Sequence, residues 1–381
     1  MAKLGDICFQ ITDGSHNPPA GIENSKHLML SSKNINDDEI TTTAPRFLTD
    51  EQFDIENKRT NVLSGDLLMT IVGTVGRVAV VPVMLAGICL QRSVAVIKPN
   101  PTIINNRYLM YQLQSMRKFL ESEARGVAQK GIYLKQVGDL SVITPPLDEQ
   151  YRVVDTLDHI SGLIHIYQQQ LTKLDELIKA RFVEMFGTYP DNPFGWNTGK
   201  IQDVVSNVRY GSSRPAVEGG KYPYLRMNNI TYAGELDLTD TKRIDVPDSE
   251  LDKCTVQRGD VLFNRTNSKE LVGKTCVYNR DDMMVLAGFV IRVRVNERIL
   301  PEFLVAFLNT AFSKQMLLGM CKTAIGQANI NAKEMQNIGL YIPPIALQEQ
   351  FVDLKKQTDK SKLFAELFAQ STCILAENRS K

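Results

Sequence analysis

The side chains that most often carry out chemistry in proteins are few in this sequence and are not spaced as an active site requires. Its four histidines, His16, His27, His159 and His165, show no metal-ligand spacing. Its six cysteines form no C-x-x-C pair, which is typical of reduced thiols in a cytosolic protein. We find no G-x-x-x-x-G-K phosphate-binding loop and no pair of carboxylates spaced as in a nuclease. We therefore expect no catalytic residue and no bound metal in this chain.

One short motif comes close to catalytic chemistry. Asn17-Pro18-Pro19-Ala20 resembles the Asn-Pro-Pro-aromatic motif of adenine methyltransferases, in which the aromatic ring stacks on the flipped base. Here Ala20 replaces the aromatic residue, the second half of the chain has no counterpart, and no glycine-rich cofactor loop precedes the motif. A self-contained DNA methyltransferase or nuclease is therefore the less favoured alternative.

Length and composition limit the class of protein. A chain of 381 residues predicts two or three domains, and its 43% hydrophobic and 23% charged residues are ordinary for a globular protein. The net charge of +1 does not favour a nucleic-acid binder, but it does not exclude one, because only the charge on the contact face matters. The N-terminus lacks the layout of a signal peptide, and the longest apolar run, Val78–Leu90, is too short to span a bilayer. We expect a cytoplasmic protein without a membrane partner.

The strongest signal in the sequence is an internal repeat. Short segments recur in the same order at an offset of roughly 197 residues, as from Gly14 to Gly211. No single match is specific, but together they indicate a duplicated chain. The matched segments are 4–7 with 201–204, 14–15 with 211–212, 34–35 with 229–230, 65–68 with 259–262, 76–77 with 273–274, 85–87 with 286–288, 126–132 with 324–330, and 145–150 with 343–344 and, after two extra residues, 349–350.

Both halves follow the same internal plan. Short β-like runs such as Val78–Val83 and Val290–Val295 alternate with turns rich in Gly, Asn and Asp. An amphipathic helix follows, predicted at Arg107–Glu123 in the first half and Pro301–Met320 in the second. A Pro-Pro pair then ends the globular part of each half, because proline is excluded from a helix interior.

A long helix is predicted after each Pro-Pro pair. The first, Asp148–Phe186, carries apolar residues in alternating steps of three and four, which is the seam of a coiled coil. The second helix has the same spacing with a more polar centre. The predicted seam residues are Leu157, Ile160, Ile164, Tyr167, Leu171, Leu174 and Ile178 in the first helix and Phe351, Leu354, Phe368 and Leu375 in the second.

The repeat and the two helices together predict an architecture. Two similar helices separated by a globular domain can pair antiparallel, which would place the domains at opposite ends of a rod related by a pseudo-two-fold axis. The alternative is that each helix only covers a core. We expect an α+β fold with domains at 1–146 and 191–345 and helices at 147–190 and 346–381, the two helices pairing as an antiparallel coiled coil.

Four segments carry a resemblance to a known family. Pro145–Ile160, Gln169–Gly187, Lys221–Leu251 and Gly259–Tyr278 are similar to specificity subunits of type I restriction-modification systems, and the order of domains and helices agrees over nearly the whole chain. The resemblance implies two target recognition domains that read a bipartite, asymmetric sequence in double-stranded DNA. It implies two methyltransferase subunits and restriction subunits as partners. S-adenosylmethionine and ATP would then be bound by those partners, and no cofactor by this chain.

Candidate DNA contacts are polar side chains in turn-rich segments, since Arg and Lys match guanine, Asn and Gln match adenine, and Ser and Thr match either. Residues that differ between the halves are the better candidates, whereas matching Gly and Asn residues such as Asn34 and Asn229 indicate scaffold. Any of the candidates could instead be an ordinary solvated loop residue, and a coiled-coil adaptor without DNA affinity remains a second hypothesis. The candidates are Ser15, His16, Lys33, Thr70, Thr74, Arg77, Gln129 and Lys130 in the first half and Arg209, Tyr210, Ser212, Ser213, Arg214, Arg226, Asn228, Asn264, Arg265, Asn267, Ser268, Lys269, Lys274 and Gln327 in the second.

Overall fold

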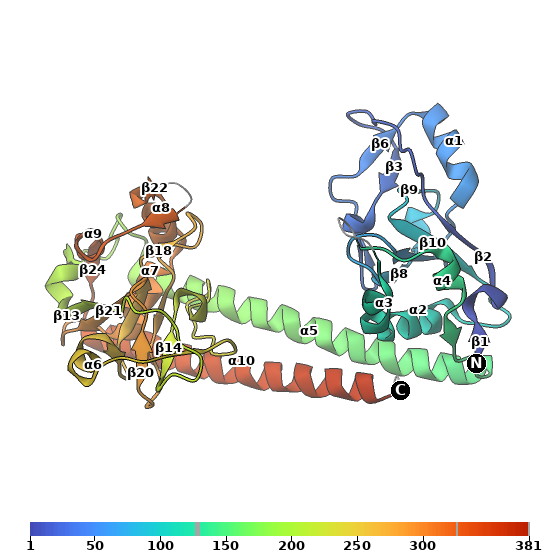
Figure 1. The fold of residues 1–381 in the computed structure, drawn as a ribbon. Helices are drawn as coiled ribbons and strands as arrows, with labels where there is room; N and C mark the ends of the chain where they lie inside the picture. Colours follow the sequence, from blue (N-terminus) through green and yellow to red (C-terminus); the bar gives the residue numbers. More distant parts are fainter. Residues whose placement is uncertain (126–129, 325–326, 380–381) are drawn as a thin grey trace. The chain divides into compact units, whose positions relative to one another are not determined.

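The computed structural model describes residues 1–125, 130–324 and 327–379, with the backbone alone for 322–324, 327, 366 and 368–379. The chain divides into two compact units, one of Met1–Tyr167 with Leu367–Lys381 and one of Gln168–Glu366. Each unit holds one domain of strands and short helices and a part of both long helices (Figure 1). The predicted α+β class with two similar domains and two long helices is confirmed.

The first domain is built on a four-stranded antiparallel sheet in the order β2-β10-β7-β8. In β10 (Val94–Pro99) both faces are buried: Ala95 and Ile97 pack toward helix α2, and Val94 and Val96 pack toward the second sheet. The sheet is therefore the middle layer of the domain. The other elements are β1 (Ala2–Lys3), β2 (Cys8–Asp13), β3 (His27–Leu30), β4 (Ile35–Asn36), β5 (Glu39–Ile40), β6 (Arg46–Leu48), α1 (Asp50–Thr60), β7 (Leu67–Thr70), β8 (Val78–Val80), β9 (Cys89–Leu90), α2 (Asn106–Ser115), α3 (Arg117–Glu123), α4 (Leu134–Gly138) and β11 (Ser141–Val142).

The second domain has the same topology. Its central sheet has the order β13-β21-β17-β19, and its second sheet, β15-β14-β20-β16, corresponds to β6-β3-β9 of the first domain with one added strand. The predicted repeat is thus a duplication of the fold. The elements are β12 (Asn197–Lys200), β13 (Val205–Tyr210), β14 (Tyr222–Leu225), β15 (Lys242–Ile244), α6 (Asp248–Cys254), β16 (Thr255–Val256), β17 (Val261–Asn264), β18 (Thr266–Asn267), β19 (Thr275–Val277), β20 (Met284–Leu286), β21 (Val290–Val295), α7 (Pro301–Leu308), α8 (Ala311–Met320), β22 (Lys322–Ala324), β23 (Gln327–Asn329), α9 (Ala332–Gln336) and β24 (Gly339–Ile342).

Two of the predicted segment matches are wrong in register. The backbone N–H of Ser15 donates to the carbonyl of Leu90 (2.7 Å), and Ser212 donates in the same way to Leu286 (2.6 Å), so Leu90 and not Leu85 corresponds to Leu286. The predicted match of segment 85–87 fails because it enters a 3₁₀ turn instead of the strand. At the start of the long helices, the buried Gln150 corresponds to Gln348 without any insertion, since Gln350 is exposed.

The two amphipathic helices are each broken into two. The predicted helix Arg107–Glu123 is divided at Met116 into α2 and α3. The predicted helix Pro301–Met320 is bent by 70° between α7 and α8, because Thr310 caps α8 by accepting a hydrogen bond from the N–H of Ser313. Within the part of the chain that the structure describes, no single helix is long and apolar enough to span a membrane, and only this bent pair together meets that length and composition.

The long helices are α5 (Leu147–Phe186) and α10 (Ile345–Arg379). In the second unit they run antiparallel, because Asp175 forms an ion pair with Lys362 while Phe182, further along α5, contacts Phe351, nearer the start of α10. Along α5, the predicted seam residue Leu157 is buried and Ile160, Ile164, Tyr167, Leu171, Leu174 and Ile178 are half-buried, whereas Leu163, Ile166 and Leu177 between them are exposed.

The contact of the two helices extends beyond the predicted seam. Phe182 and Phe186 continue it at the end of α5 and pack on Phe351 with ring centroids 5.3 and 5.7 Å apart. On α10, Phe351 is buried and Leu354 is half-buried. The side chains of Phe368 and Leu375 lie outside the described residues.

Candidate nucleic-acid interface

The loop that follows the first strand of each central sheet is held in place by a glycine. A Cβ atom on Gly14 would lie 2.2 Å from the carbonyl oxygen of Leu90, and one on Gly211 would lie 2.2 Å from that of Leu286. No larger residue fits without moving the backbone. The matching Gly-Ser pairs therefore fix the loop, and the residues after them, His16 and Ser213, are exposed at equivalent places.

In the first domain this loop borders a groove. Two adjoining depressions of about 490 and 250 Å³ share His16, Val72 and Arg92 in their linings. Ser15 and Lys33 lie in one of them. We call this surface the basic groove and define it by its basic side chains, which are His16, Lys33, Arg59, Arg92 and Arg125.

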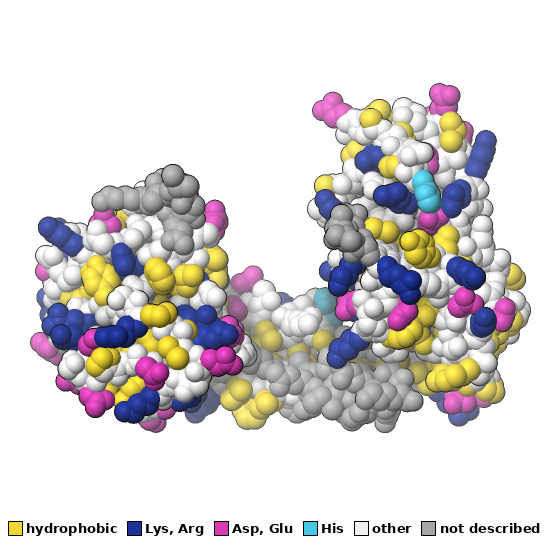
Figure 2. Space-filling view, viewed as in Figure 1, with side chains coloured by type: hydrophobic (Ala, Val, Ile, Leu, Met, Phe, Trp, Pro, Cys, Tyr) yellow, Lys and Arg dark blue, Asp and Glu magenta, His cyan; other side chains and the backbone are white. Residues whose placement is uncertain are grey.

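The basic groove contains one buried carboxylate. Asp13 forms an ion pair with Arg59 and accepts a hydrogen bond from His16 Nε2, with a distance of 2.8 Å. Lys33, Arg92 and Arg125 are exposed. Figure 2 shows Lys and Arg side chains on the visible face of this domain. The groove therefore presents hydrogen-bond donors and positive charge, which suits a phosphate backbone and base edges.

In the second domain the corresponding place is occupied by a stacked pair. The guanidinium of Arg265 lies over the ring of Tyr210, 4.9 Å from its centroid, and donates to Asn329 Oδ1 (3.2 Å). The Tyr210 hydroxyl accepts a hydrogen bond from the backbone N–H of Ala332 (2.9 Å). These contacts hold Arg265 against β23 of the small sheet β18-β23-β22 and Tyr210 against the start of α9.

Equivalent backbone hydrogen bonds show that the two sites coincide in the repeat. Arg92 donates its N–H to the carbonyl of Ser15 (2.9 Å), and Gly288 donates to that of Ser212 (2.7 Å). Gly288 thus replaces Arg92, and the guanidinium of Arg265 donates to the carbonyl of Gly288 (3.4 Å). Both domains place an arginine at this point, but Arg92 comes from the segment after β9 in the first, and Arg265 from the link between β17 and β18 in the second.

The candidates at the surface of the second domain, apart from Tyr210 and Arg265, fall into two groups. Arg214 and Arg226 are held in ion pairs with Glu250 (2.6 Å) and Asp240 (2.9 Å), so part of their charge is neutralised. The other group has accessible side chains that form no ion pair within the part of the chain that the structure describes. Arg209, Ser213, Asn228 and Lys269 are exposed, and Asn267 and Ser268 are half-buried.

Four candidates occupy structural positions instead of the surface. Thr70 and Asn264 correspond to each other at the end of the third strand and are fully buried. Ser212 is also buried, and its hydroxyl accepts a hydrogen bond from the N–H of Arg214. Lys274 is buried and donates to the carbonyl of Met227 (3.0 Å), and burial lowers its pKa.

The remaining candidates lie around turns. Arg77 is half-buried and donates to Asn36 Oδ1 (3.1 Å). Thr74 and Lys130 are exposed. Gln129 and the side chain of Gln327 lie outside the described residues.

Some features of the sites were predicted and others were missed. Asn34 and Asn229, predicted as scaffold, are buried, and the amide oxygen of each accepts from the backbone N–H three residues earlier (3.1 and 2.9 Å). Arg59, Arg92 and Arg125 were missed, because no pattern around them distinguishes them from other surface arginines. Among the described side chains, Cys8, Cys89, Cys254, Cys276 and Cys321 are free thiols, and no group of three or more His, Cys, Asp or Glu side chains is placed to hold a metal ion.

A comparison with protein families identifies the family of this chain. A sequence model of the type I restriction modification DNA specificity domain matches residues 22–176 and 193–367. The chain is 22% identical over 274 residues to the type I restriction enzyme EcoKI specificity subunit of Escherichia coli (strain K12), an alignment covering 68% of this chain and 59% of that protein. The chain therefore spans less than two-thirds of the length of this relative.

Two solved structures share the fold. The S subunit of a type I restriction-modification system from M. genitalium aligns with a TM-score of 0.54 and 13% identity, covering 100% of this chain and 94% of that chain. A chain from a structure describing complex assembly and conformational transition of the type I R-M system aligns with a TM-score of 0.60 and 17% identity, covering 100% and 95%. Because the family match includes both domains and most of the residues, this chain belongs to the family of type I restriction modification DNA specificity domains.

Proposed function

We propose that this chain is the noncatalytic, DNA-reading specificity subunit of a type I restriction-modification complex. Its two domains would each read one short block of a bipartite target, and its helices would position two methyltransferase subunits and, where present, restriction subunits. S-adenosylmethionine and ATP would be bound by those partners. The family membership supports this role, as does the loss of the aromatic residue from the Asn17-Pro18-Pro19-Ala20 motif.

The observation that carries the proposal is the arginine placed at the same point of both domains from different segments of the repeat, Arg92 in the first and Arg265 in the second. Because both domains have the same backbone arrangement and an arginine at the same point, we expect them to bind the same kind of ligand, which we propose is duplex DNA. The neighbouring side chains differ, with Asp13 and Ile71 in the first domain where Tyr210 and Arg265 stand in the second. Different side chains on one frame predict different base sequences, and so an asymmetric target.

The test is to co-express the chain with its methyltransferase subunit and to map methylated adenines across host DNA. We expect a bipartite, asymmetric motif that disappears when this chain is deleted. Two results together would favour the alternative of a coiled-coil adaptor without DNA affinity. The assembled complex would show no salt-dependent association with DNA, and deletion of this chain would leave the methylation pattern unchanged.

A further inference from the structure

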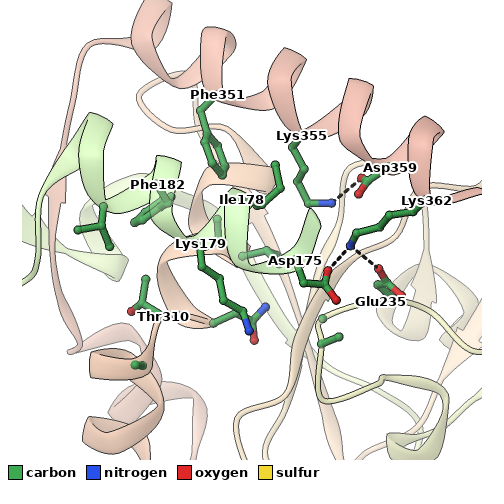
Figure 3. Close-up of a pocket in the computed structure, with 17 residues that line it drawn as sticks. Asp175, Ile178, Lys179, Phe182, Glu235, Thr310, Phe351, Lys355, Asp359 and Lys362 are labelled. Atoms are coloured by element: carbon green, nitrogen blue, oxygen red, sulfur yellow. Dashed lines mark hydrogen bonds and ion pairs between the residues drawn. The ribbon is translucent and has the colours of Figure 1, made fainter. Parts of the chain in front are cut away.

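The second unit contains a cavity of about 230 Å³ next to the two long helices (Figure 3). One wall is formed by α5 and another by α10, while α7 and the turn around Gly234 close it from the domain side. Neither Tyr210 nor Arg265 lines the cavity, so the cavity is separate from the proposed DNA surface.

The lining is mostly apolar, and five of the six charged side chains around it, all except Lys179, form ion pairs with one another. Ile178, Phe182, Val305, Ala306 and Phe351 supply apolar surface. Figure 3 marks the ion pairs of the rim, which join Lys355 to Asp359 (2.6 Å) and Lys362 to both Asp175 and Glu235. An uncharged, apolar group is therefore the occupant that costs least to desolvate.

The first domain shows what fills this place when the cavity is absent. Asn105 and Leu300 are equivalent, because their N–H groups are bound by the matching Gln150 and Gln348. Tyr111 on α2 lies as many residues after Asn105 as Ala306 on α7 lies after Leu300, so Tyr111 and Ala306 are equivalent too. The Tyr111 hydroxyl donates to Asp158 (2.6 Å) on the first turns of α5. The ring thus lies between the domain and the long helix.

The corresponding position of the second domain lacks this ring. Ala306 leaves the space open, and the ring of Phe351, which replaces Val153 on the long helix, is turned toward Phe182 and Phe186. Ala306 thus stands where the first domain has Tyr111, while the surrounding backbone and its hydrogen bonds to the buried glutamine are the same in both domains. The size is adequate, because a dry apolar cavity of about 150 Å³ in another protein binds benzene.

We propose that this cavity binds the phenol ring of a tyrosine side chain supplied by a partner protein. Asp359 on α10 corresponds to Ser161 on α5, whose hydroxyl lies 3.4 Å from the hydroxyl of Tyr111 in the first domain. Asp359 can accept a hydrogen bond from a phenol bound in the cavity. A tyrosine ring inserted between two helices and a domain is a typical anchor of a protein interface. The inference rests on the proposed function only in taking the methyltransferase subunit as the partner.

The first arm of the test uses p-cresol, the side chain of tyrosine, and the full chain alone. We expect saturable shifts of the methyl resonances of Ile178, Val183 and Val305 in a ¹³C-methyl NMR titration. Toluene, which lacks the hydroxyl, should bind several-fold more weakly. Ala306→Tyr, which copies the first domain, should fold normally and abolish the shifts, whereas Ala306→Ser should retain them.

The second arm measures the affinity of the chain for the methyltransferase subunit. We expect Ala306→Tyr to weaken the complex at least ten-fold and Ala306→Ser to leave it unchanged. The proposal is overturned if p-cresol causes no saturable shift, if toluene binds as tightly, or if Ala306→Tyr assembles with the affinity of the unaltered chain. The p-cresol arm needs neither DNA nor partner, so its failure would not count against DNA reading.

Discussion

Gln150 and Gln348 hold the first turns of the two long helices with the same set of hydrogen bonds. Both side chains are fully buried. In each case the amide oxygen accepts from one backbone N–H and the amide nitrogen donates to two backbone carbonyls. The partners are Asn105 N (2.7 Å), Ile103 O (3.0 Å) and Pro145 O (2.8 Å) for Gln150, and Leu300 N (2.8 Å), Arg298 O (3.1 Å) and Pro343 O (2.8 Å) for Gln348.

The first prediction concerns the stability that Gln348 contributes. Gln348→Ala removes a fully buried side chain and its hydrogen bonds to three backbone groups, and we expect it to lower the free energy of unfolding of the second domain by about 2–4 kcal/mol. Urea unfolding followed by the fluorescence of Trp196 measures this, because Trp196 is the only tryptophan and packs on the core of that domain. Gln350→Ala, on the exposed face of the same turn, is the control and should change the stability by less than about 0.5 kcal/mol. Equal effects of the two variants would contradict the assignment.

These two glutamines also show why the duplication was predictable and its register was not. Helix periodicity and the Pro-Pro pair identified the long helix α5, since both depend on local spacing. The identical dipeptides Glu149-Gln150 and Glu349-Gln350 suggested a match that burial contradicts. Only the three-dimensional contacts distinguish the buried glutamine from its exposed neighbour.

The candidate site was less predictable for a related reason. His16, Lys33, Arg59, Arg92 and Arg125 come from separate loops and helices, and only the folded sheet brings them to one groove. Among the predicted contacts, Thr70 and Asn264 are buried because they end a central strand, where polar side chains serve the adjacent turn. Tyr210 stands where the first domain has Asp13, so the two halves do differ at this candidate position, and its contact with DNA stays a prediction.

A second prediction follows for Arg92 in the basic groove. Arg92→Ala should weaken binding of the assembled complex to its target DNA about ten-fold, because an exposed guanidinium in the groove is removed without loss of core packing. If the lost contact is to phosphate, the salt dependence of binding should also become shallower. The control is Lys3→Ala. It removes an exposed cation on β1 that pairs with Asp139, and it should leave the affinity for DNA unchanged. Equal losses for both variants would indicate a nonspecific effect of charge.

The third prediction separates the two domains by their targets. Arg265→Ala should relax the sequence preference in one block of the methylated motif and leave the other block unchanged, since Arg265 belongs to the second domain alone. Sequencing of methylated adenines in cells carrying the variant gives both readouts together. Arg258→Ala, which removes an exposed partner of Asp281 in the same domain, is the matched control. Relaxation of both blocks would argue against independent reading.

The fourth prediction tests the aromatic contact between the long helices. Phe351→Ala removes a fully buried ring that packs on Phe182 and Phe186, so we expect a loss of about 3–5 kcal/mol in the stability of the second domain. Leu363→Ala, at an exposed position further along α10, should cost little. Urea unfolding followed by Trp196 fluorescence again measures the difference. A small effect of Phe351→Ala would mean that the helix pair is held mainly elsewhere.

The last prediction concerns pH and Lys314. Burial, reinforced by the charge of Lys274, lowers the pKa of Lys314 from 10.5 to about 8. Its ammonium donates to the carbonyl of Gly273 (3.3 Å) and lies 5.1 Å from the centroid of the Tyr232 ring. Between pH 8 and 10.5 the unfolded chain binds more protons at this group than the folded chain, so the contribution of Lys314 to stability rises with pH across that window.

Other lysines and tyrosines titrate in the same range, so the effect is measured as a difference. The stability of Lys314→Met relative to the unaltered chain should fall as the pH is raised from 7.5 to 9.5, because the cost of burying the charged ammonium disappears from the unaltered chain alone. Urea unfolding of both proteins at each pH gives the difference. A constant difference across this range would show that Lys314 keeps its proton, and that the contacts with Gly273 and Tyr232 outweigh the burial.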